Sequence, residues 1–357
     1  MDQVPDSAAC NEAVKVAKKR GYSRLSGFVN GVLRNISRKK ETISYPKKDK
    51  NLVTYLSVTY SIPEWIIKFF MKTYDDETVE KIIESYLEDK KTTLCCLMSK
   101  GGKDVIRKEL EEENVTVEDG ELIENAVKIS DYDFLYRLRA FREGKCYVQD
   151  ESSMLCAKLA GAKEGQFVMD LCSAPGGKSL YTADQMKGSG QVLSRDLTEY
   201  KTDLIEDNIE RMGFTNMEAE VFDATILDEE HIEAADVVIA DVPCSGLGIM
   251  GKKNDIKYHI SEDGMKDLVK LQREILTNAV QYVKHGGTLI YSTCTINPEE
   301  NEKNMQWIIN NFDYEAVDIT EELPKNLKIE TAKDGYIQLL PGVHPCDGFF
   351  IAKLRRK

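Results

Sequence analysis

The sequence predicts an α/β protein whose larger, C-terminal part is a parallel, doubly wound sheet. From Gln149 onward, short apolar runs alternate with stretches of helical periodicity. Most of these runs are followed by a helical stretch, which is the pattern of strands that are buried on both faces and joined by helical crossovers. Ahead of this part, the pattern predicts a small α+β module and, at the start of the chain, two short helices.

Five runs are predicted to be strands of the large sheet: FVMDLC (167–172), QVLSRD (191–196), EAEVFD (218–223), ADVVIAD (235–241) and GTLIYST (287–293). Helices are expected near 176–187, 199–212, 263–284 and 298–311, and two late strands near 335–341 and 348–355. The last of these helices has a well-marked start. Asn297 is a good N-cap, Pro298 suits the first helical position, and Glu300 stands at the third.

The N-terminal part of the chain divides into two segments. Helices are expected at 7–20 and 23–38, split by Gly21, and a basic linker with Pro46 follows at 39–50. The next segment predicts helices near 63–74 and 76–88, a strand at 92–98, a helix near 101–113 and a strand near 114–117. The expected domains are therefore 1–45, 46–146 and 147–357.

Composition limits the class of protein. The 357 residues are 42% hydrophobic, enough for a large core, but no run of 18 apolar residues exists to span a membrane. The start, MDQVPDSAAC, is acidic and polar, unlike a signal peptide. Nine cysteines without a C-x-x-C pair, and only four histidines, argue against a disulfide framework and against a metal site. A reducing cytoplasm and a monomeric state are expected.

Charge is unevenly distributed along the chain. The net charge is −13, yet residues 1–50 carry 12 Lys/Arg against five acids, so this segment is +7 and the remainder −20. Such asymmetry favours a basic patch for nucleic acid on an otherwise acidic enzyme. The alternative is a solvated helix face.

Polar or reactive groups follow all five predicted strands, where parallel sheets bind their ligands. They are the turn Ser173-Ala174-Pro175-Gly176-Gly177-Lys178, then Asp196, Asp223, Asp241-Val-Pro-Cys244 and Thr293-Cys294. The glycine turn is not a phosphate-binding P-loop, because Cys172 stands where that motif needs its first glycine. Asp196 lies 20 residues after Gly176, where doubly wound folds place an acid on a ribose, although an acid that caps the next helix is an alternative. Together these groups outline a pocket for a nucleoside-bearing cofactor.

Two cysteines differ from the others in their surroundings. Free cysteines are most often core residues, and this is expected for Cys10, Cys95, Cys96, Cys146, Cys156, Cys172 and Cys346. Cys244 and Cys294 instead follow strands and sit beside turn residues, where reactive groups are common. A nucleophilic thiol needs positive groups nearby to lower its pKa, and Lys178 at a neighbouring strand end is a candidate.

The motifs DLCSAPGGKS, ADVPCSGLG with the later NDIK, and GGTLIYSTCTINPEENE resemble those of the S-adenosylmethionine-dependent RNA cytosine-5 methyltransferases. The likeness is greatest to the Sun/RsmB group, which modifies small-subunit ribosomal RNA. YVQDESS (147–153) and LPGVHPCDGFFIAKLRR (340–356) extend the resemblance through the C-terminal part. NEAVKVAKKRG and LSGFVNGVLRNI are similar to the last helices of a NusB-like RNA-binding domain, most of which the chain would then lack.

The resemblance implies a Rossmann-like class I methyltransferase sheet that uses S-adenosyl-L-methionine to methylate C5 of a cytosine in RNA, 16S rRNA above all. Cys294 would be the nucleophile, Cys244 would aid product release, and Asp241 and Lys178 would lie together in the active site. The cofactor would contact Cys172, Ser173, Ala174, Pro175, Gly176, Gly177, Lys178, Asp196, Asp223 and Asp241.

The resemblance is incomplete in the predicted strand at 92–98. Members of the group have an arginine and an asparagine there, whereas this chain reads TLCCLMS. Three other readings stay open: a cytosine-5 methyltransferase of transfer RNA, one of DNA with Cys244 as the nucleophile, and a ribosome-assembly factor with a relic pocket.

Overall fold

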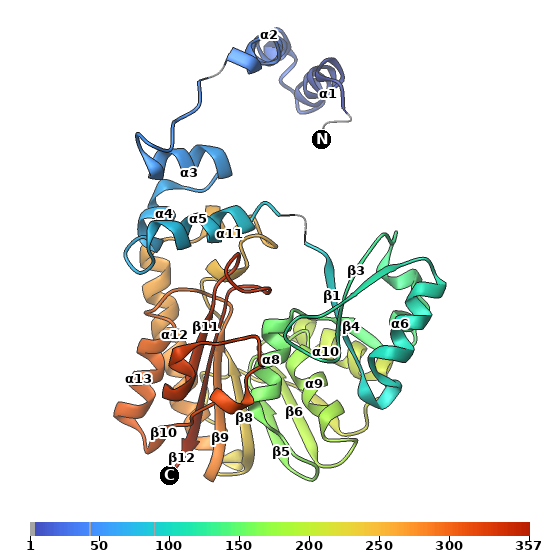
Figure 1. Cartoon of the computed structure of the whole chain (residues 1–357), viewed down its shortest axis with the longest axis vertical. Helices are drawn as coiled ribbons and strands as arrows, with labels where there is room; N and C mark the ends of the chain where they lie inside the picture. Colours follow the sequence, from blue (N-terminus) through green and yellow to red (C-terminus); the bar gives the residue numbers. More distant parts are fainter. Residues whose placement is uncertain (1–3, 43, 89) are drawn as a thin grey trace. The chain divides into compact units, whose positions relative to one another are not determined.

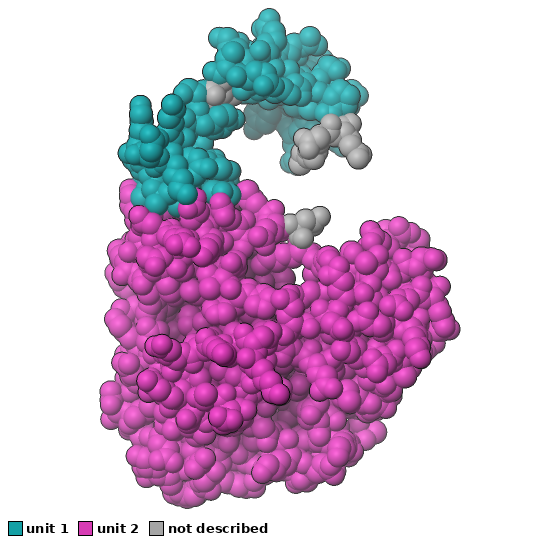
Figure 2. Space-filling model, viewed as in Figure 1, with its two compact units in different colours: residues 1–64 teal, residues 65–357 magenta. Residues whose placement is uncertain are grey.

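The computed structural model describes residues 4–42, 44–88 and 90–357 (Figure 1). Residues 1–3, part of the acidic start, and residue 43, within the expected linker, lie outside the described residues. The chain forms two compact units, one up to Glu64 and one from Trp65 to Lys357 (Figure 2). The domain boundaries expected from the sequence stay predictions, because neither the division into two units nor the family resemblance tests them.

The first unit is helical. The two helices predicted for this segment are present as α1 (Asp6–Lys19) and α2 (Ser26–Lys39), and they pack against each other. Apolar side chains of α2 are largely exposed, with Phe28 at 69% and Ile36 at 50%. Helix α3 (Leu52–Tyr60) was not expected; Asn51 caps it by accepting a hydrogen bond from Thr54 N.

The second unit contains the large sheet, with strand order β10-β12-β9-β8-β5-β6-β7 and β11 paired to β12. Strands β5 to β9 run parallel to one another, whereas β12 runs antiparallel between β9 and β10. The predicted parallel sheet is therefore confirmed, with an antiparallel edge added by the end of the chain. The strands are β5 (Phe167–Asp170), β6 (Gln191–Asp196), β7 (Met217–Val221), β8 (Ala235–Asp241), β9 (Val283–Thr293), β10 (Tyr314–Ala316), β11 (Tyr336–Leu339) and β12 (Phe349–Arg356).

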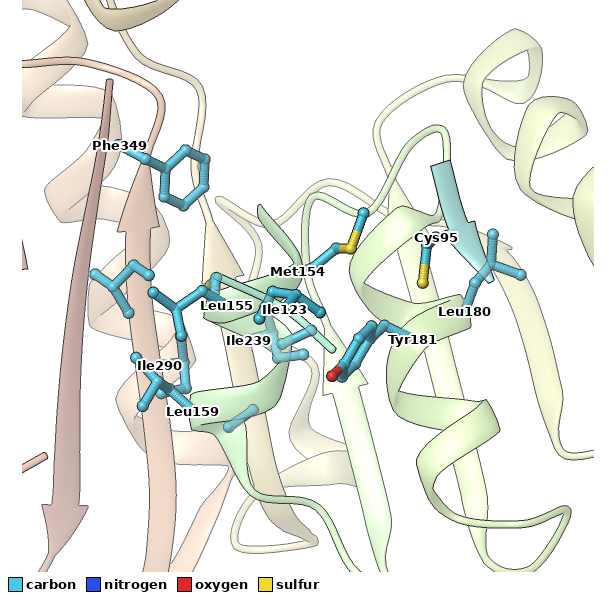
Figure 3. Close-up of a cluster of buried hydrophobic side chains, with 14 of the residues drawn as sticks. Cys95, Ile123, Met154, Leu155, Leu159, Leu180, Tyr181, Ile239, Ile290 and Phe349 are labelled. Carbon is cyan, nitrogen blue, oxygen red and sulfur yellow. The ribbon is translucent and has the colours of Figure 1, made fainter. Parts of the chain in front are cut away.

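Helices cover both faces of this sheet because strand side chains alternate between two apolar layers. One layer contains Ile239 and Ile290 with Leu155 and Leu180, whereas the neighbouring strand residues pack in the other layer with Leu276. Figure 3 shows Leu155 and Leu159 near Ile290, and Cys95 beside Leu180 on the other side of the cluster. The covering helices are α8 (Glu151–Ala160), α9 (Gly177–Gln185), α10 (Glu199–Met212), α12 (Glu262–Tyr282) and α13 (Glu302–Asn311), and the short helix α11 (Ile256–His259) lies in the connection between β8 and α12.

A smaller antiparallel sheet, ordered β2-β3-β1-β4, lies in the same unit. Leu94, Cys95 and Cys96 of its central strand β1 are buried, so these side chains are unavailable for contact with RNA. Tyr86, after α5, donates a hydrogen bond from its hydroxyl to Leu247 O at 2.8 Å, which ties α5 to the loop after β8. The elements are α4 (Glu64–Phe70), α5 (Asp76–Ser85), β1 (Thr92–Cys96), α6 (Gly102–Glu112), β2 (Thr116–Asp119), β3 (Ala126–Ser130), α7 (Arg139–Arg142) and β4 (Cys146–Val148).

The predicted start of α13 is wrong. The helix begins at Glu302, and residues 298–301 form a turn in which Asn297 Oδ1 accepts a hydrogen bond from Glu299 N at 3.1 Å. Glu300 and Asn301 turn their side chains inward to buried partners instead of continuing a regular first turn. None of the described helices is long and apolar enough to cross a membrane.

Candidate functional site at the strand ends

The ends of β8 and β9 bring two thiols together. Asp241 pairs with Ser292 in the parallel register of these strands, so the loops that follow start side by side. Cys244 Sγ and Cys294 Sγ are 3.3 Å apart, and both side chains are partly exposed. Each cysteine follows a strand, as predicted, and the two strands β8 and β9 are adjacent in the sheet.

The two cysteine loops are also joined by polar contacts. Ser245 Oγ and Thr295 Oγ1 are 2.7 Å apart, and Gly248 N donates to Cys294 O at 3.1 Å. Gly248 also contacts Gly348, whose N–H donates to Gly248 O at 3.0 Å. A Cβ on Gly248 would come within 2.2 Å of Gly348 O, so only glycine fits at this contact.

Cys244 is held in its neutral form. The adjacent Cys294 sulfur, together with burial, keeps the pKa of the Cys244 thiol well above its usual range. Cys244 therefore retains its proton at neutral pH and can donate its S–H to Cys294 Sγ.

Lys178 and Asp241 form an ion pair beside the thiols. Lys178 Nζ lies 2.5 Å from Asp241 Oδ2, and Ser292 Oγ donates to Asp241 Oδ1 at 2.8 Å. Burial lowers the pKa of Lys178, but the Asp241 carboxylate outweighs it and the net shift is upward. The Lys178 ammonium also lies 5.2 Å from the centre of the Phe349 ring. Lys178 is therefore a fixed cation, and its proximity to Asp241 agrees with the sequence prediction.

The glycine turn forms a cradle between β5 and α9. Gly176 has φ +101°, a conformation that favours glycine, and the Ala174-Pro175 peptide bond is cis. A Cβ on Gly177 would lie 3.0 Å from Gln149 Nε2, so the turn approaches its neighbours closely. The first N–H groups of α9 have no partner within the helix and suit an anionic group such as a carboxylate.

Asp196 and Asp223 line the neighbouring strand ends. Asp196 is buried at the end of β6 and accepts hydrogen bonds from Ala174 N at 3.0 Å and Lys201 Nζ at 2.9 Å. Asp223 lies two residues past the end of β7, and hydrogen bonds from Thr225 lower the pKa of its carboxyl. Helix N–H donors on one side and carboxylate acceptors on the other suit a molecule that carries a carboxylate, hydroxyls and an amino group, so these residues fit S-adenosyl-L-methionine.

The remaining cysteines follow the expectation in part. Cys10, Cys95, Cys96, Cys146 and Cys156 are buried, as predicted for core residues. Cys172 and Cys346 are half-buried, and burial raises the pKa of each thiol.

Several residues at the site were not singled out from the sequence. Asp170 ends β5; its Oδ2 accepts from Ser179 Oγ at 2.8 Å, while its buried Oδ1 has no hydrogen-bond partner among the residues that the structure describes. Burial raises the pKa of Asp170 to about 6. Its place at a strand end was a usable signal. The sequence holds no comparable signal for Phe349, because its position follows from the antiparallel insertion of β12 beside β9.

Comparison with known proteins identifies relatives of the whole chain. The model of the 16S rRNA methyltransferase RsmB/F family matches residues 157–355, and that of the NusB family matches residues 1–38. The probable ribosomal RNA small subunit methyltransferase B of Bacillus subtilis (strain 168) is 37% identical over 362 residues, which cover 100% of this chain and 80% of the relative.

Solved structures agree with these matches. The crystal structure of PH0851 superposes with a TM-score of 0.85 at 28% identity, over 98% of this chain and 77% of that one. A methyltransferase homolog protein from Pyrococcus horikoshii superposes with a TM-score of 0.73 at 25% identity, over 86% of this chain and 100% of its own. The predicted methyltransferase fold and the NusB-like start are both confirmed.

Proposed function

Because this chain belongs to the RsmB/F family of 16S rRNA methyltransferases, we propose that it transfers a methyl group to C5 of a cytosine in 16S rRNA. S-adenosyl-L-methionine is the cofactor and, when bound, supplies an electrophilic methyl group. The observation that carries the proposal is the pair of thiols 3.3 Å apart beside the Lys178–Asp241 ion pair. Ring carbon C5 of cytosine is a poor nucleophile. Addition of a thiolate to the ring makes C5 nucleophilic enough to attack a methyl group.

Residues 172–178 and three strand-end carboxylates hold the cofactor in this proposal. The cradle from Cys172 to Lys178 takes the methionine part on its backbone groups, Asp196 takes the ribose hydroxyls, and Asp223 lies by the adenine. Asp241 stands between cofactor and base. The open helix N–H groups at Gly177 and the close approach allowed by the two glycines support this arrangement.

Cys294 acts as the nucleophile. Its thiolate forms a bond to C6 of the base, and the electron pair of the C5–C6 double bond moves toward C5, which then attacks the methyl group while the bond between that methyl carbon and sulfur breaks and its electron pair stays on the sulfur. Asp241, held by Lys178 and Ser292, lies where a polar group can assist as charge develops on the ring. The family to which the chain belongs supports this choice of nucleophile, and Cys244 Sγ lies 3.3 Å from Cys294 Sγ.

Release reverses the addition. A base takes the proton from C5, the electron pair reforms the C5–C6 double bond, and the S–C6 bond breaks to return the Cys294 thiolate. Cys244 aids this step from its position beside the adduct sulfur. The target cytosine must be unstacked from its neighbours before it can reach the thiols.

The test is methyl transfer with the purified full chain. Labelled S-adenosyl-L-methionine is incubated with 16S rRNA, or with transfer RNA or DNA in parallel, and digested nucleosides are identified by mass spectrometry. The proposal expects 5-methylcytidine in 16S rRNA alone. If 5-methylcytosine forms only in transfer RNA or only in DNA, that nucleic acid is the substrate and the proposal of 16S rRNA is wrong. If the chain does not bind the cofactor in a calorimetric titration, the result favours an assembly factor.

A further inference from the structure

The loops that carry the two thiols share a buried carboxylate that the proposed mechanism does not use. Glu300 is 0% exposed. Its Oε2 accepts hydrogen bonds from Ser245 N and Gln272 Nε2, each at 2.9 Å, and its Oε1 accepts from Asn297 Nδ2 at 2.9 Å. Ser245 directly follows Cys244, and Asn297 lies three residues after Cys294. One side chain therefore contacts both cysteine loops.

The partners of Glu300 are themselves fixed. Gln272 Nε2 also donates to Pro243 O at 2.9 Å, and its Oε1 accepts from Asn304 Nδ2 at 2.8 Å. Asn297 Oδ1 accepts from Glu299 N at 3.1 Å. A buried network of this kind is rigid, because breaking any of its hydrogen bonds leaves a buried donor without an acceptor and destabilises the fold.

We propose that Glu300 is a positioning residue that sets the separation of the Cys244 and Cys294 sulfurs. This inference rests on the proposed function for its effect on catalysis, since both thiols must reach one cytosine in turn. The separation itself belongs to the chain and can be measured without RNA. A displacement of about 1 Å is enough to slow a covalent step by about a hundredfold.

The substitution Glu300→Gln disrupts the hydrogen bonds that the carboxylate accepts from both cysteine loops, with little change in side-chain size. Glutamine has one acceptor oxygen, and its NH₂ group would face N–H donors. The matched control is Glu299→Gln, the same change one residue earlier at an exposed side chain that pairs with Lys303. The rescue variant is Glu300→Gln with Asn297→Asp, which lets the glutamine NH₂ donate to the new carboxylate while its oxygen accepts from Ser245 N and Gln272.

The first readout is disulfide formation between Cys244 and Cys294 in the full chain treated with diamide. Diamide takes two electrons and two protons from the thiol pair and becomes a hydrazine, and peptide mapping by mass spectrometry follows the linked peptides. We expect Glu300→Gln to form the disulfide at least about tenfold more slowly than the wild type, whereas Glu299→Gln stays within about twofold. The rescue variant should regain most of the rate.

The second readout is steady-state methyl transfer. In Glu300→Gln, kcat should fall by about tenfold or more while KM for S-adenosyl-L-methionine stays within about twofold, because the cofactor cradle is untouched. A folded Glu300→Gln chain with unchanged disulfide rate and kcat overturns the proposal. If that variant does not fold, a folded rescue variant with a slow disulfide rate overturns it. A wild type that methylates no RNA would refute the proposed function, while the disulfide rates would still decide the role of Glu300.

Discussion

At the scale of single residues, the site combines groups whose protonation is set by their neighbours. Cys244 stays neutral beside Cys294, and Lys178 stays charged beside Asp241. Asp170 differs from these, because its buried Oδ1 has no partner in the described part of the chain and its pKa is raised by burial. Such a carboxyl reduces stability once it ionises.

The substitution Asp170→Asn is expected to change how stability depends on pH. The folded pKa is raised from 3.8 to about 6, so the folded state holds this proton more tightly than the unfolded state. The wild type therefore has the full contribution of this group below pH 4 and loses it as pH rises toward 6. Between pH 4.5 and 7 the variant should gain about 2 kcal/mol of unfolding free energy relative to the wild type.

Urea denaturation of both chains at these two pH values measures the difference. An isosteric amide keeps the oxygen that accepts from Ser179. A variant whose stability parallels that of the wild type at both pH values would show that Asp170 is already ionised near pH 4.

At the scale of elements, much of the large sheet follows from the sequence. The predicted bounds of β6 and β8 are those of the structure, because their apolar runs end at Asp196 and Asp241, where polar groups begin. Helix α10 is likewise as predicted. Strands β3, β4 and β10 were not predicted, because each is short and lacks a long apolar run.

The start of α13 shows why local signals are not enough. Asn297, Pro298 and Glu300 make a good helix start by sequence, but the tertiary partners of Glu300 lie on α12 and on the Cys244 loop. The buried hydrogen bonds outweigh the local preference for a capped first turn. Separate segments of chain form this network, so the sequence pattern alone does not reveal it.

Contact between Gly248 and Gly348 joins the Cys244 loop to the segment before β12. We expect Gly248→Ala to lower the unfolding free energy by about 1–3 kcal/mol, because a methyl group would collide with Gly348 O and must displace the backbone. The displacement would also move Phe349 away from Lys178, so methyl transfer should fall. Thermal denaturation and the methyl-transfer assay measure the two effects.

A matched control for this change is Gly31→Ala. Gly31 lies within α2 and a Cβ there would meet nothing within 4 Å. Alanine should stabilise that helix by up to about 1 kcal/mol. If the Gly248→Ala chain is as stable as this control, the close contact between Gly248 and Gly348 does not contribute to the free energy of unfolding.

At the scale of the whole molecule, the uneven charge predicts where RNA is attracted. Residues 1–50 are basic, whereas the rest of the chain is acidic. Lys39 is exposed at the end of α2, and Lys40, which follows it, pairs with Asp6 at 3.2 Å across exposed side chains. Such pairs exchange readily with phosphate, because exposed ion pairs are weak.

Reversing both charges, Lys39→Glu with Lys40→Glu, should weaken binding of RNA and lower the slope of log affinity against log salt by about 1–2. The control reverses Lys266 and Lys270, two exposed lysines of α12 that pair with neighbouring acids. Filter binding at several salt concentrations gives the slopes. Equal slopes for the wild type and the Lys39/Lys40 variant would leave the basic segment as a solvated helix face.

The candidate site was largely predictable for a reason that operates across the whole sheet. Parallel strands bring their carboxyl ends to one edge, so residues far apart in sequence, such as Lys178, Asp241 and Cys294, converge once the strand order is known. The roles of the two thiols do not follow from that convergence alone. Their proposed assignment rests on the family to which the chain belongs.

The most direct test of the account is covalent trapping on RNA that contains 5-fluorocytidine, in which the fluorine blocks release. The wild type should form a stable adduct in the presence of S-adenosyl-L-methionine, and Cys294→Ala should form none. Cys244→Ala should accumulate an adduct even on RNA with ordinary cytidine, because release is impaired. An adduct formed by Cys294→Ala and abolished in Cys244→Ala would contradict the assignment of Cys294 as the nucleophile.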